Sequence, residues 1–185
     1  MTFFDLKDCG GKLIDLYFWD ELNGIIVGGT SGGFDDSHAI ILRTDDGGIN
    51  WNVIYEGNRD GEWCWKISFP TPDIGYVSIQ TGLWGIAVDE YFLKTTDGGN
   101  TWSEHIFYTA GQSAEFGGYS TQGIGFINKD IGWMGSYVKQ PTLMTLDGGV
   151  TWSESDFGAH VNRIRFLSNN LGYASGKTVY KYASD

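Results

Sequence analysis

The sequence predicts an all-β protein, a four-bladed β-propeller, and three observations lead to this fold class. A phrase of eight residues occurs three times, as TDDGGINW at 44–51, TTDGGNTW at 95–102 and TLDGGVTW at 145–152. Short β-rich runs with Gly and Asp turns surround each copy, as is typical of antiparallel hairpins. Twenty-eight glycines against three prolines also favour many tight turns. Four-stranded units repeated in series are the blades of a propeller.

Each unit has the same four strands in the same order. The first strand ends in a phenylalanine and the second opens with a glycine. The third precedes the repeated phrase, and the fourth begins at the tryptophan of that phrase. We expect one domain over residues 1–185, with blades at about 12–57, 63–108, 121–157 and 161–185 plus 1–8.

The fourth unit contains the first three strands, and residues 1–8 offer its fourth. Thr2-Phe3 precede Phe18 by about as many residues as Thr151-Trp152 precede Phe166. We therefore expect the N-terminal strand to pair into the C-terminal blade, which closes the ring and leaves no open sheet edge. The alternative is a half-ring that dimerises into eight blades; a monomer of 20.5 kDa is expected only for the closed ring.

The repeated phrase has the composition of a tight turn, because Asp bonds nearby backbone N–H groups and Gly accepts positive φ. The phrase resembles the Asp-box (BNR) repeat of sialidases and many other propellers. The surrounding F…D-x-G-[Tyr/Trp]…G spacing is similar to photosystem II stability/assembly factor-like repeat proteins. This resemblance covers essentially the whole chain, with Asn50 as one departure. It implies a structural role, not a catalytic one, for Asp46, Gly48, Trp51, Asp97, Gly99, Trp102, Asp147, Gly149 and Trp152.

The connections between strands predict which face of the propeller binds a ligand. One face carries short, uniform turns, whereas the other carries the variable segments 28–38, 56–65, 81–91 and 109–122. Variable insertions on one face of a repeat scaffold usually mark the working face. The candidate binding residues there are Trp63, Trp65, Trp84, Phe116, Tyr119, Asp35, Asp36, Asp89 and Glu90, with further acids at Asp60, Glu62 and Glu115. Aromatic rings beside acids suit a sugar or a protein partner; the alternative is that some rings only hold the long loops down.

The first strands supply a second candidate site, around the central channel. Their apolar side contains Leu16, Ile67, Ile124 and Ile164, and period-two alternation places the neighbouring residues on another face. That other side carries Asp15, Lys66, Arg163 and Arg165. Two interpretations stay open: a salt-bridge network that fills the channel, or a small-anion site.

No catalytic residue, metal ligand or cofactor site is predicted. The sialidases that share the repeat use an arginine triad, but only four arginines occur here and no three obviously converge. A paired-carboxylate glycosidase would need two facing acids, which the sequence alone does not place. The three histidines fall in different units without ligand spacing, at His38, His105 and His160.

Charge and composition exclude further classes of function. A net charge of −11 disfavours nucleic acid and anionic membranes. No apolar run reaches the length of a membrane span, and no signal peptide is visible, which predicts a cytoplasmic protein unless a leader was removed. Cys9 and Cys64 are expected as free thiols, with a disulfide as the alternative.

These observations predict a non-catalytic binding or scaffold propeller that presents its loop-rich face to a protein partner. The alternative is a carbohydrate-binding, lectin-like module or a sialidase-related glycoside hydrolase.

Overall fold

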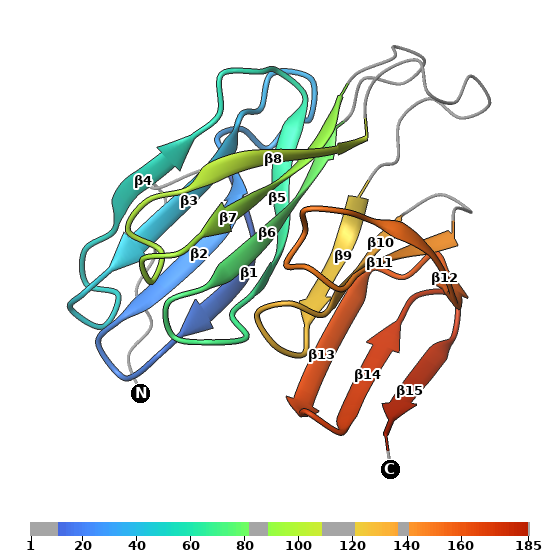
Figure 1. Cartoon of the computed structure of the whole chain (residues 1–185). Coiled ribbons are helices and arrows are strands. Elements are labelled where there is room, and N and C mark those ends of the chain that lie inside the picture. Colours follow the sequence, from blue (N-terminus) through green and yellow to red (C-terminus); the bar gives the residue numbers. More distant parts are fainter. Residues whose placement is uncertain (1–10, 82–88, 109–120, 137–140, 185) are drawn as a thin grey trace.

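The computed structural model describes residues 11–81, 89–108, 121–136 and 141–184, and within them it confirms an all-β protein with four blades (Figure 1). Blade 1 contains β1 (Lys12–Phe18), β2 (Gly24–Gly29), β3 (Ala39–Thr44) and β4 (Asn52–Glu56). Blade 2 contains β5 (Glu62–Ser68), β6 (Gly75–Thr81), β7 (Glu90–Thr95) and β8 (Ser103–Tyr108). Blade 3 contains β9 (Thr121–Phe126), β10 (Gly132–Ser136), β11 (Pro141–Thr145) and β12 (Ser153–Ala159). Blade 4 contains β13 (Arg163–Ser168), β14 (Leu171–Ser175) and β15 (Val179–Ala183).

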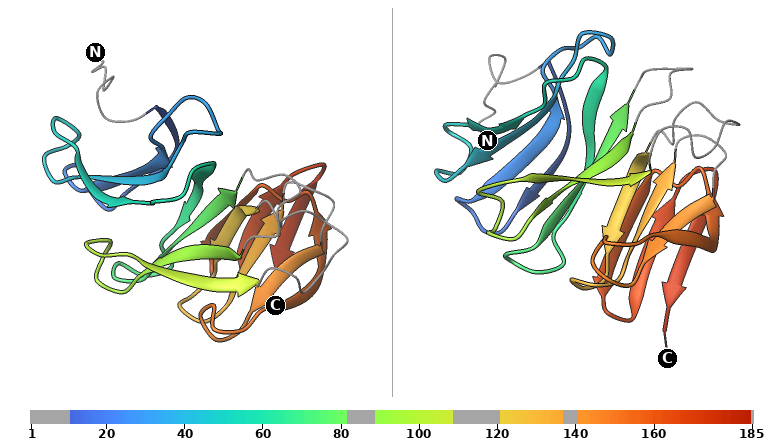
Figure 2. Two further views of the ribbon diagram at one scale, coloured as in Figure 1. Left: turned by 90° about the horizontal axis from the view of Figure 1, so that it is seen from above. Right: turned by 45° about the horizontal axis from the view of Figure 1, so that its top comes forward.

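Every blade is an antiparallel sheet whose strands pair in chain order. The blades follow one another around an arc, as the view from above shows (Figure 2). The first strand of a blade is its inner strand: β5 packs on β1 and β2, and β9 lies between blade 2 and β13. This order positions the connections between strands at the two ends of the blades, which is where a propeller carries its sites.

The predicted apolar side of each first strand forms the joint between neighbouring blades. Ile67 and Ile124 are each 1% exposed, and Ile164 is 5% exposed. Each lies in a core cluster with residues of the preceding blade. Leu16, at the same position in blade 1, is 56% exposed.

The three repeated phrases form one turn, which we call the DGG turn (residues 44–51, 95–102 and 145–152). In each copy the threonine hydroxyl donates to Oδ1 of the aspartate two residues later, at 2.8–2.9 Å. The same hydroxyl accepts the N–H of the second glycine at 2.9 Å. The two glycines of every copy have positive φ, which a side chain would strain. These hydrogen bonds of each turn lie within the turn itself, and the threonine and aspartate side chains that form them serve a structural role.

The second and third DGG turns are also held by the preceding blade. The Arg43 guanidinium donates to the Gly98 carbonyl at 2.7 Å, and the Lys94 ammonium donates to the Gly148 carbonyl at 2.8 Å. Trp152 of the third turn packs edge-on against Phe126 at the joint between blades 2 and 3. The turns thus lock the joints as well as the hairpins.

The expected pairing of residues 1–8 with the last blade lies outside the described residues, as does Cys9. Near the axis, the Arg165 side chain of blade 4 reaches Asp15 of blade 1 at 3.2 Å and the Ile67 carbonyl of blade 2 at 3.4 Å. Cys64 is a buried free thiol. In the described part of the chain, no helix has the length and apolar character needed to cross a membrane.

Candidate functional site

The loop-rich end of blades 1 and 2 carries the described candidate residues, and Trp63 lies beneath this surface. Its side chain is 7% exposed, because β5 begins at Glu62, inside the segment that the sequence predicts as a loop. Phe34 of the 28–38 loop packs edge-on against Trp63 at 4.6 Å, and a Cβ on Gly29 would collide with the indole. The position of Trp63 thus agrees with the interpretation that some rings hold the long loops down.

Trp65 is half-buried and stacks on Trp63 with ring centroids 6.0 Å apart. Asp35, Asp36 and Asp89 are exposed, whereas Glu90 is buried in β7 and accepts a hydrogen bond from the Thr81 hydroxyl at 3.2 Å. Glu90 falls in the predicted 81–91 segment, but it is the first residue of β7 and its side chain points inward. Three further predicted residues lie outside the described part of the chain: Trp84, Phe116 and Tyr119.

A groove of about 600 Å³ lies at the loop end of blade 2, beside the 57–61 connection that leads from blade 1. The 57–61 connection and β5 form one side, and β7 and β8 form the other. It is lined by Arg59, Asp60, Glu62, Thr81, Asp89, Tyr91, Glu104 and Ile106. Four of these are acids and one is a cation, so the groove is negatively charged.

The centre of the groove is a fixed network around Arg59. Its guanidinium donates to Glu62 at 2.9 Å and to Glu104 at 2.7 Å, and lies 4.2 Å from the centroid of the Tyr91 ring. The Tyr91 hydroxyl donates to Glu62. Burial raises the pKa of Glu62, and its bonds to Tyr91 and Arg59 oppose that rise. The carboxylates of Glu62 and Glu104 are therefore both engaged in ion pairs with Arg59.

The rim of the groove offers groups for a ligand. Asp60 and Asp89 are exposed, and Ile106 is 58% exposed on β8. The His38 ring lies 2.9 Å from Asp60, and this hydrogen bond raises the pKa of the histidine. An acidic rim beside an apolar side chain fits a ligand with cationic or N–H donor groups next to an apolar group.

Sequence reasoning found part of this groove. Asp60, Glu62 and Asp89 fall in the predicted long segments, but Arg59, Tyr91, Glu104 and Ile106 carry no recognisable signal. Glu104 and Ile106 are alternate residues of an outer strand, a pattern typical of an ordinary solvent face. Pairing of β8 with β7 brings them beside Tyr91, and the Tyr55 hydroxyl of blade 1 donates to Glu104 at 2.9 Å.

The structure also brings the four predicted channel residues together. Asp15 pairs with Arg165 at 3.2 Å and Arg163 at 3.6 Å, and it accepts the Ile67 N–H at 3.3 Å. Burial lowers the pKa of Lys66, nearby Asp15 opposes this, and the two arginines add to it. One carboxylate thus faces three cations, which is compatible with both predicted interpretations.

No metal-binding group of three or more His, Cys, Asp or Glu side chains occurs in the ranges that the structure describes.

The fold is similar to that of several solved propellers. One is a structure described as YCF48 bound to D1 peptide, with a TM-score of 0.57 and 18% identity over 95% of this chain and 54% of that one. Another is the GH74 enzyme of Niastella koreensis, with a TM-score of 0.60 and 15% identity over 95% of this chain and 28% of that one. A third is the GH74 xyloglucanase of Xanthomonas campestris, with a TM-score of 0.58 and 13% identity over 85% and 25%.

These similarities show a β-propeller like that of YCF48. The chain spans about half the length of the YCF48 structure and about a quarter of the two GH74 enzymes. No family model matches the sequence, and no curated protein matches it.

Proposed function

We propose that this chain is a non-catalytic binding propeller that holds an extended, basic segment of a protein partner in the groove at the loop end of blade 2. The observation that carries the proposal is the Arg59 network. It fixes Glu62 and Glu104 in the groove, and the side chains of Asp60 and Ile106 are exposed at its rim. A rigid floor with an acidic rim suits recognition, because little side-chain order is lost on binding.

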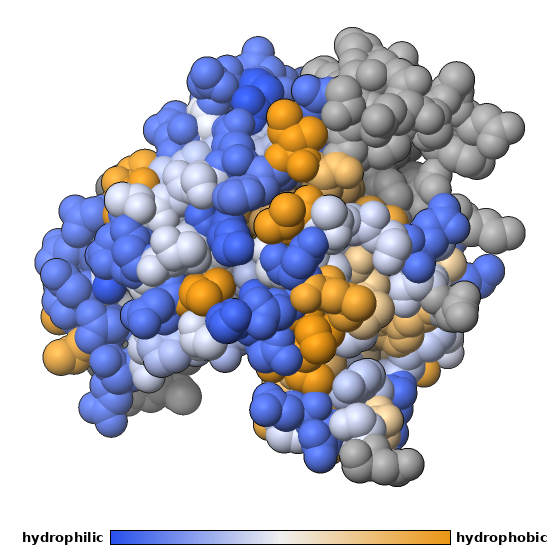
Figure 3. All heavy atoms as spheres, viewed as in Figure 1, coloured by the Kyte–Doolittle hydropathy of each residue, from blue (hydrophilic) through white to orange (hydrophobic). Residues whose placement is uncertain are grey.

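The surface around the groove supports a charged partner. The face of blade 1 seen in Figure 3 is mainly hydrophilic, and hydrophobic atoms gather down the middle of that view. The chain as a whole carries a net charge of −11. Long-range attraction therefore favours the encounter with a basic segment, and added salt weakens it.

The resemblance to YCF48 adds support of a different kind. That propeller has been solved with a peptide bound, so a propeller of this shape can hold a peptide. The hydrogen bonds of the three DGG turns support their interpretation as Asp boxes, and hence the likeness to photosystem II assembly factor-like repeats.

Carbohydrate binding is the second candidate, on the basis of the half-buried Trp65 ring and the rim carboxylates. The GH74 propellers share the fold, but their sequences are only 13% and 15% identical to this chain. Trp63, the most buried of the predicted rings, is covered by protein and offers no face to a sugar.

A binding experiment separates the two candidates. Fluorescently labelled basic, neutral and acidic peptides of one length are titrated with the protein, and a glycan array is probed in parallel. We expect the basic peptides to bind most tightly and Asp60→Asn to weaken them about two- to fivefold. Asp73→Asn is the matched control, because Asp73 is an exposed acid in the β5–β6 turn, at the opposite end of blade 2.

Equal effects of the two substitutions would mean that the groove is not the site. Sugar binding that is lost in Trp65→Ala, without peptide binding, would favour the second candidate. Hydrolysis of any glycoside would contradict a non-catalytic role.

A further inference from the structure

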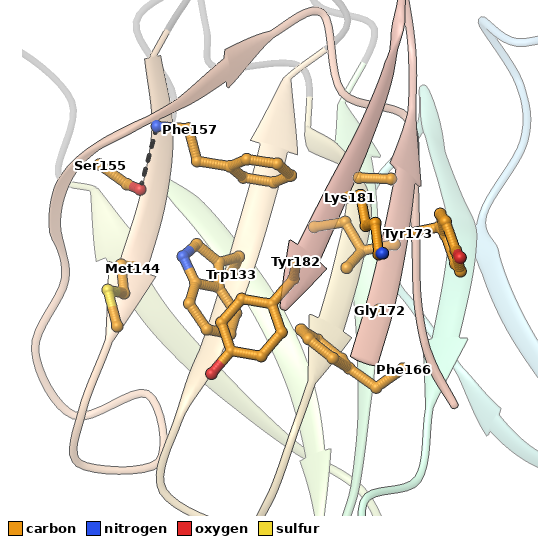
Figure 4. Close-up of a pocket in the computed structure, with 11 residues that line it drawn as sticks. Trp133, Met144, Ser155, Phe157, Phe166, Gly172, Tyr173, Lys181 and Tyr182 are labelled. Carbon is orange, nitrogen blue, oxygen red and sulfur yellow. Dashed lines mark hydrogen bonds between the residues drawn. The ribbon is translucent and has the colours of Figure 1, made fainter. Parts of the chain in front are cut away.

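The groove of blade 2 differs in chemistry from the pocket at the joint between blades 3 and 4. That pocket, of about 380 Å³, is walled mainly by aromatic rings, among them Trp133, Phe157 and Tyr182 (Figure 4). The groove of blade 2 is instead lined by four acids and one arginine. Binding in the groove therefore depends on the charge at its rim, and a titratable group beside that rim can control it.

His38 is such a group, and it stands behind the rim without lining the groove itself. Its Nε2 lies 2.9 Å from Asp60 Oδ1, and its Nδ1 lies 3.6 Å from Glu56 Oε1. Both ring nitrogens thus face carboxylates. A neutral imidazole can donate from only one nitrogen, whereas the imidazolium donates from both. The surroundings of His38 are therefore complementary to its protonated form.

Backbone hydrogen bonds fix the positions of His38 and Asp60. The His38 N–H donates to the Thr30 hydroxyl at 2.9 Å, and the Thr30 N–H donates to the His38 carbonyl at 3.0 Å. The Glu62 N–H donates to the Ser37 carbonyl at 2.9 Å, which holds the loop before β3 beside the connection that carries Asp60. The contact between the imidazole and the carboxylate is therefore supported by the backbone of both loops.

We propose that His38 is a pH-dependent competitor for the rim carboxylate of Asp60, so that the groove binds a basic segment more tightly when His38 is neutral. This inference rests on the function proposed above and adds its regulation. The imidazolium of His38 and a cation of the partner both draw on the charge of Asp60. Loss of the His38 proton leaves that charge to the partner. By linkage, binding of the partner favours loss of the same proton.

The charges around His38 set the direction of the effect. Within the described chain, Glu56 at the end of β4 and Asp60 in the following connection face the ring. The hydrogen bond with Asp60 raises the pKa of His38 above its ordinary value of 6.5, and Glu56 adds to this rise. A partner cation at Asp60 weakens the attraction for the proton and lowers the pKa of His38 in the complex. The affinity should therefore increase as the pH rises through the pKa of His38 and stay constant above it.

Binding measurements at two pH values test the proposal. A labelled peptide of arginine, leucine and glycine with blocked termini contains no group that titrates between about pH 5.5 and about pH 8, so a change in affinity comes from the protein. We expect its Kd to be about threefold lower at the higher pH. His38→Gln keeps an N–H donor for Asp60 but is uncharged at both pH values. Its Kd should therefore be the same at both.

His105→Gln is the matched control. His105 alternates with Glu104 and Ile106 along β8, so its ring lies on the other side of the strand from these groove residues. There it stacks on Phe92, with ring centroids 5.4 Å apart. This variant should keep the pH dependence of the wild-type protein.

An NMR titration of the free protein tests the pairing without a peptide. The pKa of His38 should lie above 6.5 and fall toward that value in Asp60→Asn. An unchanged pKa in Asp60→Asn would overturn the proposal. A pH dependence of binding that persists in His38→Gln would also overturn it, and would assign the effect to Glu62, because protonation of Glu62 weakens cation binding in the same direction.

The binding data also separate this inference from the proposed function. Peptide binding that does not change with pH in the wild-type protein contradicts the role of His38 alone. Absence of peptide binding at both pH values contradicts the proposed function and this inference with it.

Discussion

The guanidinium of Arg43 and the carbonyl of Gly98 lie 2.7 Å apart, so a side chain of blade 1 holds the turn of blade 2. Lys94 and Gly148 repeat this relationship one blade further along, at 2.8 Å. A hydrogen bond from a charged donor to a partly buried carbonyl is stronger than a neutral one. The propeller is therefore held together by polar clamps between blades as well as by apolar joints.

Replacing either clamp residue should destabilise the protein. Arg43→Met and Lys94→Met each leave a turn carbonyl without its charged donor, and we expect a loss of about 1–3 kcal/mol in the free energy of unfolding. Urea denaturation with an unchanged m-value measures it. Lys177→Met, which alters an exposed lysine in the turn before β15, should change stability little. An equal loss in this control would show that net charge, and not the clamp, is responsible.

The DGG turns should make stability depend on pH in the acid range. Hydrogen bonds from Thr151 and Thr101 lower the pKa of Asp147 and Asp97 from 3.8 to about 2. A folded-state pKa below the unfolded value stabilises the protein above about pH 4, and this stabilisation is lost as the pH falls toward 2. Thr151→Val should raise the pKa of Asp147 in NMR titrations and flatten the decline of Tm over this range. A decline unchanged in Thr151→Val would contradict the assignment.

Trp63 should prove to be a stability residue. Trp63→Ala removes a buried indole that supports the 28–38 loop, and we expect a loss of about 3–5 kcal/mol. Proteolysis within 28–38 should become faster. Trp65→Ala, which alters a half-buried ring, should cost clearly less. Normal stability of Trp63→Ala would mean that the loop is held by other contacts.

Asp15 should be required to balance the charges at the axis. Asp15→Asn leaves Lys66, Arg163 and Arg165 without their carboxylate, and because both arginines are partly exposed we expect a loss of roughly 2 kcal/mol. Sulfate should raise the Tm of the variant more than that of the wild-type protein, because an anion can replace the carboxylate. An equal rise in the two proteins would exclude an anion site opened by this substitution.

Much of the fold can be predicted from the sequence because the repeat encodes it locally. The glycines with positive φ and the threonine–aspartate bonds of the turns involve residues four apart or fewer, so the phrase itself specifies them. Period-two alternation predicts the burial of Ile67, Ile124 and Ile164, but it does not predict that Leu16, at the same position in blade 1, is exposed.

The candidate site is harder to predict because it depends on contacts between blades. β5 begins at Glu62, inside the 56–65 segment predicted as a loop, and the Glu62 N–H bonds to the Ser37 carbonyl at 2.9 Å. That contact joins residues from different blades, and it changes Trp63 from a loop residue to a buried one. The Arg59–Glu104 pair likewise spans the width of blade 2, which no local pattern records.

Met144 of blade 3 stands at the strand position that Arg43 has in blade 1 and Lys94 has in blade 2. Blade 3 therefore lacks the cation that clamps the next turn in the two preceding blades. Arg43 and Lys94 each donate to a carbonyl in the DGG turn of the following blade, whereas the thioether of Met144 has no such donor. A designer who wished to lengthen this propeller would begin by restoring lysine at Met144 and adding one further DGG unit after β15.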